Sequence, residues 1–294
     1  MELNKIYIGN SLDVLKTFPS KSIDMAITSP PYYGLRSYGT EPQIWDAVIN
    51  CNHEWKEIKI PRPNQSGGKS KKQSTNKGSF AVDYNDRYSY SHRCVKCNAW
   101  KGELGQEETV EEYIKHLCDI FDEVHRVLKP EGSLWVNIAD TYIPIGKFRK
   151  GLYCVPDLFK IEMQYKRKWL CRMENIWYKP NQMPTSVRDR FNVDYEKMLH
   201  FVKQPKYYFK QQKEPTTDGT GTRIKRSVWT INNVANSKNH TATFPKELVE
   251  TPIKATCPEN GVVLDCFAGS GTVFEVCKEN NVNFVGIELN ETFI

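Results

Sequence analysis

The fold of this chain is predicted most directly by one stretch near its carboxyl end, Gly261-Val-Val-Leu264-Asp265-Cys-Phe267-Ala268-Gly269-Ser-Gly271-Thr272-Val273. It reads as an apolar strand, a glycine turn and the start of a helix, the arrangement with which open α/β sheets bind nucleotide-like ligands. The glycines do not form a dinucleotide fingerprint, and Asp265 would repel a pyrophosphate. A second strand, Asn283 to Leu289, carries Glu288 where such folds hydrogen-bond ribose hydroxyls. The pattern therefore predicts an adenosine ligand with a cationic, phosphate-free tail, namely S-adenosylmethionine.

A second motif, Thr28-Ser29-Pro30-Pro31-Tyr32, follows the apolar run Ile23 to Thr28. The amino nitrogen of a nucleobase is a poor nucleophile because its lone pair is conjugated into the ring, so a catalyst must hold both N–H groups with acceptors. The Ser29 hydroxyl and the Pro30 carbonyl offer such acceptors, and Tyr32 offers a ring on which a base can stack. The motif predicts a pocket for a flipped-out base, whereas the alternative is a strand-ending Ser-Pro-Pro turn with a packed tyrosine.

Together the two motifs resemble the β-class amino DNA methyltransferases, the bacterial, archaeal and viral family that methylates cytosine N4 or adenine N6. In that family the catalytic tetrad precedes the cofactor motif. Three further segments are similar to other blocks of the family: Val127 to Val136; Ile176 to Asn181 with Pro184, Arg188 and Glu196; and His240 to Leu248. The resemblance covers most of the chain outside roughly residues 40 to 105. It implies a Rossmann-like α/β sheet with helices on both faces.

The resemblance also implies roles for individual residues. The catalytic group is expected to be Ser29, Pro30, Pro31 and Tyr32. Asp265 is expected at the methionine amino end of the cofactor, directly or through water, and Glu288 at the ribose. For each of these acidic residues the alternative is a helix cap or a surface charge. The full expected cofactor set is Asp265, Phe267, Ala268, Gly269, Gly271, Thr272 and Glu288, with Phe244 and Pro245 closing over the cofactor.

The choice of base rests on Ser29. In the family that the chain resembles, serine before Pro-Pro is more typical of N4-cytosine enzymes, and Asp or Asn is more typical of N6-adenine enzymes. The sequence thus favours cytosine N4, with adenine N6 as the alternative. Cytosine C5 methylation is disfavoured because its nucleophilic cysteine usually follows a proline, and here Cys257-Pro258 has the reverse order. A non-catalytic zinc-dependent nucleic-acid-binding module and an RNA or protein amino methyltransferase are the other classes.

The order of the predicted elements indicates a circular permutation. The chain starts with a strand at residues 5–9, a helix at 11–18 and a strand at 23–28, and we expect it to begin at the third strand of the usual methyltransferase order and to finish just after the second. A capping box, Thr109 with Glu112, begins a helix, and Pro130 with Gly132 ends it before a strand at 133–138. The chain stops at Ile294, just into the helix expected after Glu288, which indicates truncation or loss of that helix.

The pattern divides the chain into four parts. Residues 1–39 and 106–202 are expected to form the catalytic part, 203–239 the target-recognition region and 240–294 the cofactor-binding part. Residues 40–105 are expected to be an insertion with a zinc site.

The expected zinc ligands are two pairs at chelating spacing, Cys51-x-His53 and Cys94-x-x-Cys97, with His92 as a competing ligand. The alternative is that these residues are unpaired in a loop. The other cysteines are expected to be reduced core residues: Cys118, Cys154, Cys171, Cys257, Cys266 and Cys277.

Composition is consistent with an intracellular enzyme that acts on a polyanion. The chain has 294 residues, 39% hydrophobic residues and a net charge of +6, and it has no signal-peptide or membrane-spanning pattern. We expect a cytoplasmic location in a prokaryotic or viral host cell. Basic residues gather between Lys59 and Lys77 and between Lys203 and Arg226, which suits a nucleic acid as the partner, although a solvated surface is the alternative. The family resemblance implies that this partner is duplex DNA. A cognate restriction endonuclease and a homodimer are further expected partners.

Overall fold

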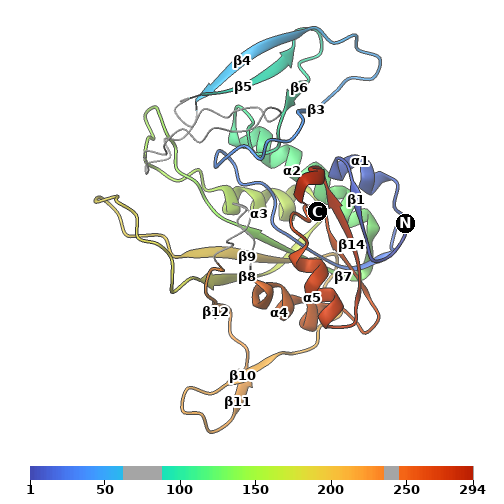
Figure 1. Ribbon diagram of the computed structural model, residues 1–294, viewed down its shortest axis with the longest axis vertical. Coiled ribbons are helices and arrows are strands. Elements are labelled where there is room, and N and C mark those ends of the chain that lie inside the picture. The colour runs from blue at the N-terminus through green and yellow to red at the C-terminus, as the bar shows by residue number, and fades with distance from the viewer. Residues whose placement is uncertain (62–87, 235–244, 294) are drawn as a thin grey trace.

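The computed structural model describes residues 1–61, 88–234 and 245–293. Its centre is an eight-stranded sheet in the order β1-β14-β13-β2-β7-β9-β8-β12 (Figure 1). All neighbours in this sheet are parallel except β9, which is antiparallel to both β7 and β8. In sheet order the strands are β1 (Lys5–Ile8), β14 (Asn283–Glu288), β13 (Val262–Asp265), β2 (Ile23–Thr28), β7 (Leu128–Ile138), β9 (Tyr195–Val202), β8 (Leu170–Tyr178) and β12 (Val228–Thr230).

Helices pack on both faces of this sheet, as predicted. One face is covered by α1 (Ser11–Lys16), α2 (Val110–Val127) and α3 (Val155–Lys166), and the other by α4 (Lys246–Thr256) and α5 (Thr272–Glu279). A short 3-10 helix, η1 (Glu291–Phe293), follows β14. The apolar stripe of α2 is buried because its members repeat at helical spacing and face the sheet: Ile114, Leu117, Phe121 and Val124. No helix in the described part of the chain is long and apolar enough to cross a membrane.

The predicted permutation is confirmed by the strand order. The first strand of the chain, β1, pairs with the last, β14, where Lys5 lies opposite Val285. Strand β13 pairs with β2, where Val263 lies opposite Met25. The strand that ends at Asp265 and the strand that leads to Ser29 are therefore neighbours, although more than two hundred residues separate them in the sequence.

Two local predictions around α2 were only partly right. Thr109 caps the helix by accepting a hydrogen bond from the backbone N–H of Glu112 at 3.2 Å, but the Glu112 carboxylate binds Arg93 at 2.8 Å instead of returning to Thr109. Strand β7 begins directly after α2, so Pro130 and Gly132 lie inside the strand rather than before it. They form an irregularity there, because the pairing of β2 with β7 shifts between Ile23 and Met25.

A second, four-stranded antiparallel sheet projects over α2 at the upper end of the view in Figure 1. Its order is β3 (Gln43–Trp45), β6 (Trp100–Gly102), β5 (Tyr88–Cys94) and β4 (Trp55–Pro61). At the opposite end of the molecule a small hairpin projects, β10 (Lys213–Pro215) with β11 (Thr222–Ile224) (Figure 1). The main sheet lies between these two projections.

The described cysteines are reduced. Cys118, Cys257, Cys266 and Cys277 are buried as predicted, and Cys171 is half-buried. The prediction was wrong for Cys154, which is exposed: it precedes α3 with a left-handed backbone (φ 59°), and this turn directs it away from the core.

Candidate functional site

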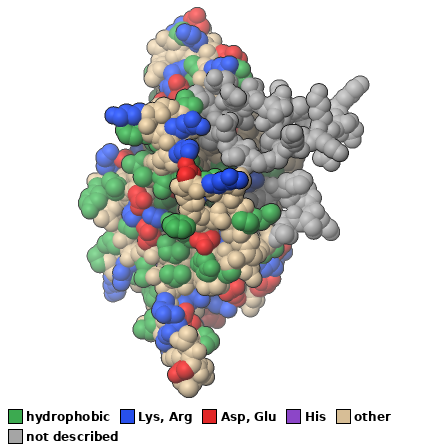
Figure 2. Space-filling model, turned by 90° about the vertical axis from the view of Figure 1, so that its left-hand side faces the viewer, with side chains coloured by type: hydrophobic (Ala, Val, Ile, Leu, Met, Phe, Trp, Pro, Cys, Tyr) green, Lys and Arg blue, Asp and Glu red, His purple; other side chains and the backbone are tan. Residues whose placement is uncertain are grey.

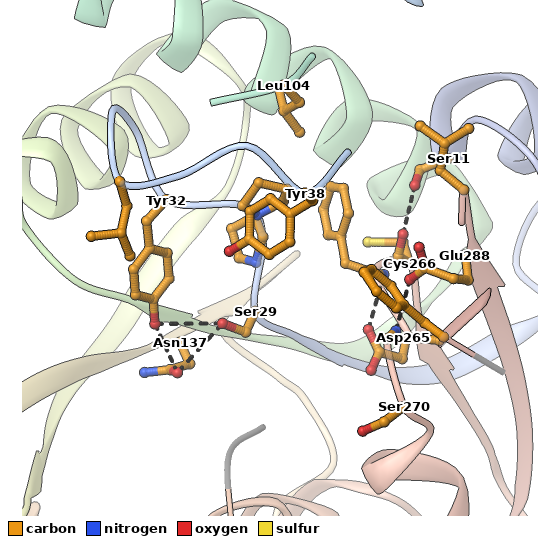
Figure 3. A pocket seen from close by; sticks show the side chains of 18 of the residues that line it. Ser11, Ser29, Tyr32, Tyr38, Leu104, Asn137, Asp265, Cys266, Ser270 and Glu288 are labelled. Atoms are coloured by element: carbon orange, nitrogen blue, oxygen red, sulfur yellow. Dashed lines mark hydrogen bonds between the residues drawn. The ribbon is translucent and has the colours of Figure 1, made fainter. Parts of the chain in front are cut away.

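The two sequence motifs meet in one cavity of about 430 Å³ at the carboxyl ends of β2, β13 and β14. Figure 3 shows Ser29, Tyr32 and Asn137 on one side of it, and Asp265 and Glu288 on the other. Both groups are brought together because β2 and β13 are parallel neighbours that end at the same edge of the sheet. The predicted residues that line the cavity are Ser29, Pro30, Pro31, Tyr32, Asp265, Phe267, Ala268, Gly269, Thr272 and Glu288.

Three predicted residues are placed differently. Gly271 does not line the cavity; it precedes α5 with a positive φ of 80°, a backbone conformation that favours glycine. Pro245 caps the start of α4 and also lies outside the cavity lining. Phe244 lies outside the described residues.

Asp265 is held at the end of β13 by two hydrogen bonds to one carboxylate oxygen. Its Oδ1 accepts from the Thr28 hydroxyl at 2.6 Å and from the backbone N–H of Phe267 at 3.0 Å. The side chain is 4% exposed, and burial raises the pKa of Asp265 to about 7. A buried carboxylate of this kind is costly to ionise unless a cation lies beside it, and Oδ2 is left for such a partner.

Glu288 is oriented by backbone N–H groups at the end of β14. Its Oε2 accepts from Gly269 at 2.8 Å, and its Oε1 accepts from Asn290 at 2.9 Å. An ionised carboxylate has about four lone-pair positions, so each oxygen can accept one more hydrogen bond. Gly269 has a φ of 51°, and this turn brings its N–H against the carboxylate. The arrangement can therefore bind a pair of hydroxyl groups.

The tetrad forms a hydrogen-bonded cluster with β7 and β9. The Ser29 hydroxyl lies 3.5 Å from Asn137 Oδ1 and 3.4 Å from the Tyr32 hydroxyl. Tyr32 donates to Glu196 at 2.7 Å, and its hydroxyl is 3.0 Å from Asn137 Oδ1. Burial, followed by the charge of Glu196, raises the pKa of Tyr32 well above its usual value. Tyr32 is therefore a neutral phenol whose ring is fixed at the cavity wall.

The two proline carbonyls of the tetrad have different environments. The hydroxyl of Tyr113 on α2 donates to the carbonyl of Pro31 at 2.8 Å. Within residues 1–61, 88–234 and 245–293, nothing donates to the carbonyl of Pro30. Pro30 lines the cavity, so its carbonyl is the acceptor of this pair that a ligand can use.

Several cavity residues were not predicted as site residues. Asn137 could have been found, because it is an amide in the otherwise apolar end of β7. Lys179 forms an ion pair with Glu196, and its ammonium lies 4.1 Å from the centre of the Trp177 ring. This pair joins the end of β8 to the start of β9, and only the antiparallel register of those strands reveals it. Tyr38 comes from the segment before the second sheet, and Gln43 is the first residue of its strand β3.

The predicted metal ligands lie together outside the cavity. One ligand atom from each of Cys51, His53, Cys94 and Cys97 lies within 4.8 Å of the others. The Sγ atoms of Cys51 and Cys94 are 3.9 Å apart, and Cys97 Sγ is 3.4 Å from His53 Nδ1. His92 is not in this group; it lies in β5 opposite Lys101. Three thiolates and an imidazole are a donor set that fits tetrahedral zinc.

The expected target-recognition region is divided between the two ends of the sheet's strands, with one part near the amino ends and the other at the cavity at the carboxyl ends. Tyr208 and Lys210 bond to Glu131 and Ala255, which lie near the amino ends of β7 and β13. In this part the Lys203 ammonium binds backbone carbonyls, and Arg223 and Arg226 both bind Glu214. Asn233 and Val234, in contrast, line the cavity. Residues 235–239 and most of the basic stretch from Lys59 to Lys77 lie outside the described residues.

Comparisons with known proteins agree with this geometry. The N6/N4 methyltransferase family model, described as DNA methylase, matches residues 23–294. The type II methyltransferase M.XycI of Xanthomonas campestris pv. cyanopsidis is 31% identical over 98% of this chain and 84% of its own length. M.Cfr9I of Citrobacter freundii, also a type II methyltransferase, is 30% identical over 100% of this chain and 87% of its own length.

Two solved structures share the fold. The PvuII DNA methyltransferase, which is cytosine-N4-specific, superposes with a TM-score of 0.63 and 19% identity over 98% of this chain and 83% of that one. The M1.HpyAVI complex with SAM gives a TM-score of 0.57 and 16% identity over 98% and 94% of the two chains. With the family match over residues 23–294, the chain belongs to the S-adenosylmethionine-dependent N6/N4 DNA methyltransferase family.

Proposed function

We propose that this protein transfers a methyl group from S-adenosylmethionine to the N4 atom of cytosine in duplex DNA, after the base has left the helix. One observation carries the proposal. The acceptor pair formed by Ser29 and the Pro30 carbonyl shares a single cavity with the paired carboxylates Asp265 and Glu288. A base and a cationic adenosine ligand can therefore lie side by side in this cavity.

The cofactor side fits S-adenosylmethionine by its donor set. Asp265 Oδ2 is the partner for the methionine ammonium, and a cation there offsets the cost of the buried charge. Glu288 has the acceptor capacity for two ribose hydroxyls. Phe267 supplies an aromatic face to the adenine or the sulfonium. When bound, the cofactor supplies an electrophilic methyl group on a sulfonium.

The tetrad side holds the nucleophile. The Ser29 hydroxyl can donate its own proton toward Asn137 and accept one amino N–H, while the Pro30 carbonyl accepts the other. These two acceptors favour a pyramidal nitrogen whose lone pair points at the methyl carbon. The methyl group would pass to this nitrogen, the sulfur would keep the electron pair of the broken carbon–sulfur bond as a neutral thioether, and the nitrogen would release its extra proton to solvent water. Tyr32, held as a neutral phenol, stacks on the base.

Cytosine is preferred to adenine for two reasons. Serine before Pro-Pro is more typical of the N4-cytosine enzymes in the family, and the PvuII enzyme with the same fold is cytosine-N4-specific. Adenine N6 is the alternative, because the acceptor pair would hold either amino group.

DNA is proposed to approach the open side of the cavity. Figure 2 shows that on one face of the molecule the described Lys and Arg side chains are interspersed with Asp and Glu, so charge alone does not mark the path of the duplex there. We assign target recognition to the surroundings of Asn233 and Val234 and to the second sheet, because these lie at the cavity. The segment that leads to the β10–β11 hairpin is bonded near the amino ends of the strands, away from the cavity. In this proposal residues 1–39 and 106–202 carry out catalysis, and residues 240–294 bind the cofactor. A cognate endonuclease and a homodimer stay predictions.

The test is a competition for labelled methyl groups. The protein is incubated with S-adenosylmethionine tritiated on the methyl group and with duplex DNA, RNA and protein together. We expect label in DNA only, and its loss in the Ser29→Ala variant while the cofactor still binds. Label in RNA or protein, or full transfer by Ser29→Ala, contradicts the proposal.

A further inference from the structure

The Cys/His cluster of the second sheet does not line the cavity, but Gln43 and Trp45 of the same sheet do. We propose that Cys51, His53, Cys94 and Cys97 bind one structural Zn²⁺, and that this ion fixes the second sheet so that its near edge forms one wall of the cavity. The inference goes beyond the proposed function, because it assigns a metal site and a structural role outside the methyl-transfer machinery.

The arrangement of the four ligands is that of a closed tetrahedral site. All four ligand atoms lie within 4.8 Å of one another. The separations of 3.9 Å between Cys51 Sγ and Cys94 Sγ and 3.4 Å between Cys97 Sγ and His53 Nδ1 are close to those of atoms that share a tetrahedral ion at Zn–S and Zn–N bond lengths of about 2.0–2.3 Å. Cys94 and Cys97 lie on a tight turn in which the Asn98 N–H bonds to the Cys94 carbonyl at 2.9 Å and Asn98 has a φ of 63°. Four protein ligands leave no open position, so the site is structural rather than catalytic.

The second sheet has little else to hold it together. Its buried apolar side chains in the described residues are few: Trp45, Ile60, Cys94, Ala99 and Trp100. So small a core rarely stabilises a sheet by itself, and a metal is one of the usual supplements. The cluster can cross-link two segments of the second sheet. It joins the residues before β4, at Cys51 and His53, to the turn between β5 and β6.

Residues next to the cluster contact α2. Trp100 follows the Cys94–Cys97 turn and pairs with Trp45 of β3. Both indole rings stack on His116 of α2, with ring centres 5.6 Å and 4.8 Å from the imidazole. On β5, Arg93 binds Glu108 at 2.5 Å and Glu112 at 2.8 Å. The ion therefore fixes the turn that presents Trp100 to the body of the protein.

Strand β6, which begins at Trp100, leads into the cavity wall. Glu103, the residue after β6, accepts hydrogen bonds from the Ser37 hydroxyl at 2.6 Å and from the Tyr38 backbone N–H at 2.5 Å. Tyr38 lies between the tetrad side and the cofactor side in Figure 3, and Leu104 lies above it in this view. Both line the cavity, as do Gln43 and Trp45. Displacement of β6 would therefore displace the wall that faces both ligands.

Metal content is the first test, made on the full chain without a histidine tag. Elemental analysis is expected to give one zinc per chain, and cobalt exchanged into the site is expected to show the visible bands of tetrahedral thiolate coordination. His53→Ala should lose the metal, whereas His53→Cys should retain it because four thiolates also suit zinc. Cys154→Ser, at an exposed cysteine outside the cluster, is the matched control and should keep the metal. Wild-type protein without zinc after growth in zinc-supplemented medium overturns the proposal, as does full zinc in His53→Ala.

Hydrogen exchange of the wild-type protein, before and after removal of zinc with a chelator, tests the structural role. We expect faster exchange in residues 37–45 and 100–105 as well as around the cluster, unchanged exchange in β13 and β14, and recovery when zinc is returned. This readout does not depend on activity, so it stands even if the proposed reaction is wrong. Faster exchange confined to residues 51–61 and 88–98 would contradict the role in the cavity wall.

Discussion

Replacement of Asp265 by asparagine is expected to stabilise the ligand-free protein at neutral pH while it weakens cofactor binding. Both hydrogen bonds to this side chain, from Thr28 and from Phe267, go to Oδ1. Asparagine keeps an oxygen at that position and places its amide nitrogen where Oδ2 was. The substitution therefore removes the charge and keeps the local hydrogen bonds.

The magnitude follows from the pKa. Burial raises the pKa of Asp265 from 3.8 to about 7, a shift of about three units. At about 1.36 kcal/mol per unit, ionised Asp265 costs about 4 kcal/mol, as an upper limit because water in the cavity lowers the cost. Since the folded-state pKa lies above the unfolded value, the protonated form favours folding, and this stability is lost as pH rises toward and through about 7. The advantage of Asp265→Asn is thus up to about 4 kcal/mol at pH 8 and falls to about 2 kcal/mol at pH 5.

Urea unfolding at pH 5 and pH 8, in buffers without cofactor, measures this difference. Isothermal titration with S-adenosylmethionine on the same samples should show affinity reduced by at least tenfold, because the ammonium partner is gone. Asp24→Asn is the matched control. Asp24 binds Lys129 at 2.8 Å at the far end of β2, so its loss should lower stability and leave cofactor affinity unchanged. A destabilised Asp265→Asn variant, or an advantage that does not change between pH 5 and pH 8, would refute the reasoning.

Three further outcomes are expected. Tyr32→Phe removes the hydrogen bond to Glu196, so it should lower the free energy of unfolding by about 1–3 kcal/mol. Single-turnover and binding assays on one preparation should show that methyl transfer falls more than cofactor affinity. Equal losses of transfer and affinity would contradict this role. Glu288→Gln turns an amide N–H toward the N–H of Gly269 or Asn290, and cofactor dissociation constants should rise about tenfold, roughly 1.4 kcal/mol; an unchanged constant would remove Glu288 from the ribose site. In the wild type, cofactor affinity should fall as pH drops below about 7 because Asp265 becomes protonated, and Asp265→Asn should lack this dependence in a titration series.

The parts of the fold that the sequence predicted well are those set by local backbone chemistry. The glycine turn at residues 269–271 and the prolines after Ser29 restrict the backbone in ways that few other motifs share, and both lie at strand ends as predicted. The order of the two motifs then indicated the permutation, because functional strands of an open α/β sheet must be neighbours. The cysteine spacing likewise brought four ligand atoms together.

The features that were missed depend on contacts between distant segments. Asn137 stands out locally as an amide in an apolar strand end, but its meeting with Lys179 and Glu196 depends on the register of β7, β9 and β8, which no local pattern encodes. The basic segment around Lys210 is predicted to belong to the target-recognition region, and the sequence did not indicate that its backbone N–H bonds to the Ala255 carbonyl at the end of α4. Charge composition identifies the basic residues but does not indicate at which end of the strands they lie. His116 gave no signal either, because its role requires Trp45 and Trp100 from another sheet.

The most direct measurement is the identity of the methylated base. Duplex DNA treated with the wild-type protein and S-adenosylmethionine is digested to nucleosides, and the products are separated and identified by mass spectrometry against the Ser29→Ala variant. The proposed preference for cytosine, which rests on Ser29 and on the fold shared with the PvuII enzyme, predicts N4-methylcytosine from the wild type and none from the variant. N6-methyladenine would contradict the choice of cytosine, and 5-methylcytosine or equal product from Ser29→Ala would contradict amino methylation at Ser29 and Pro30.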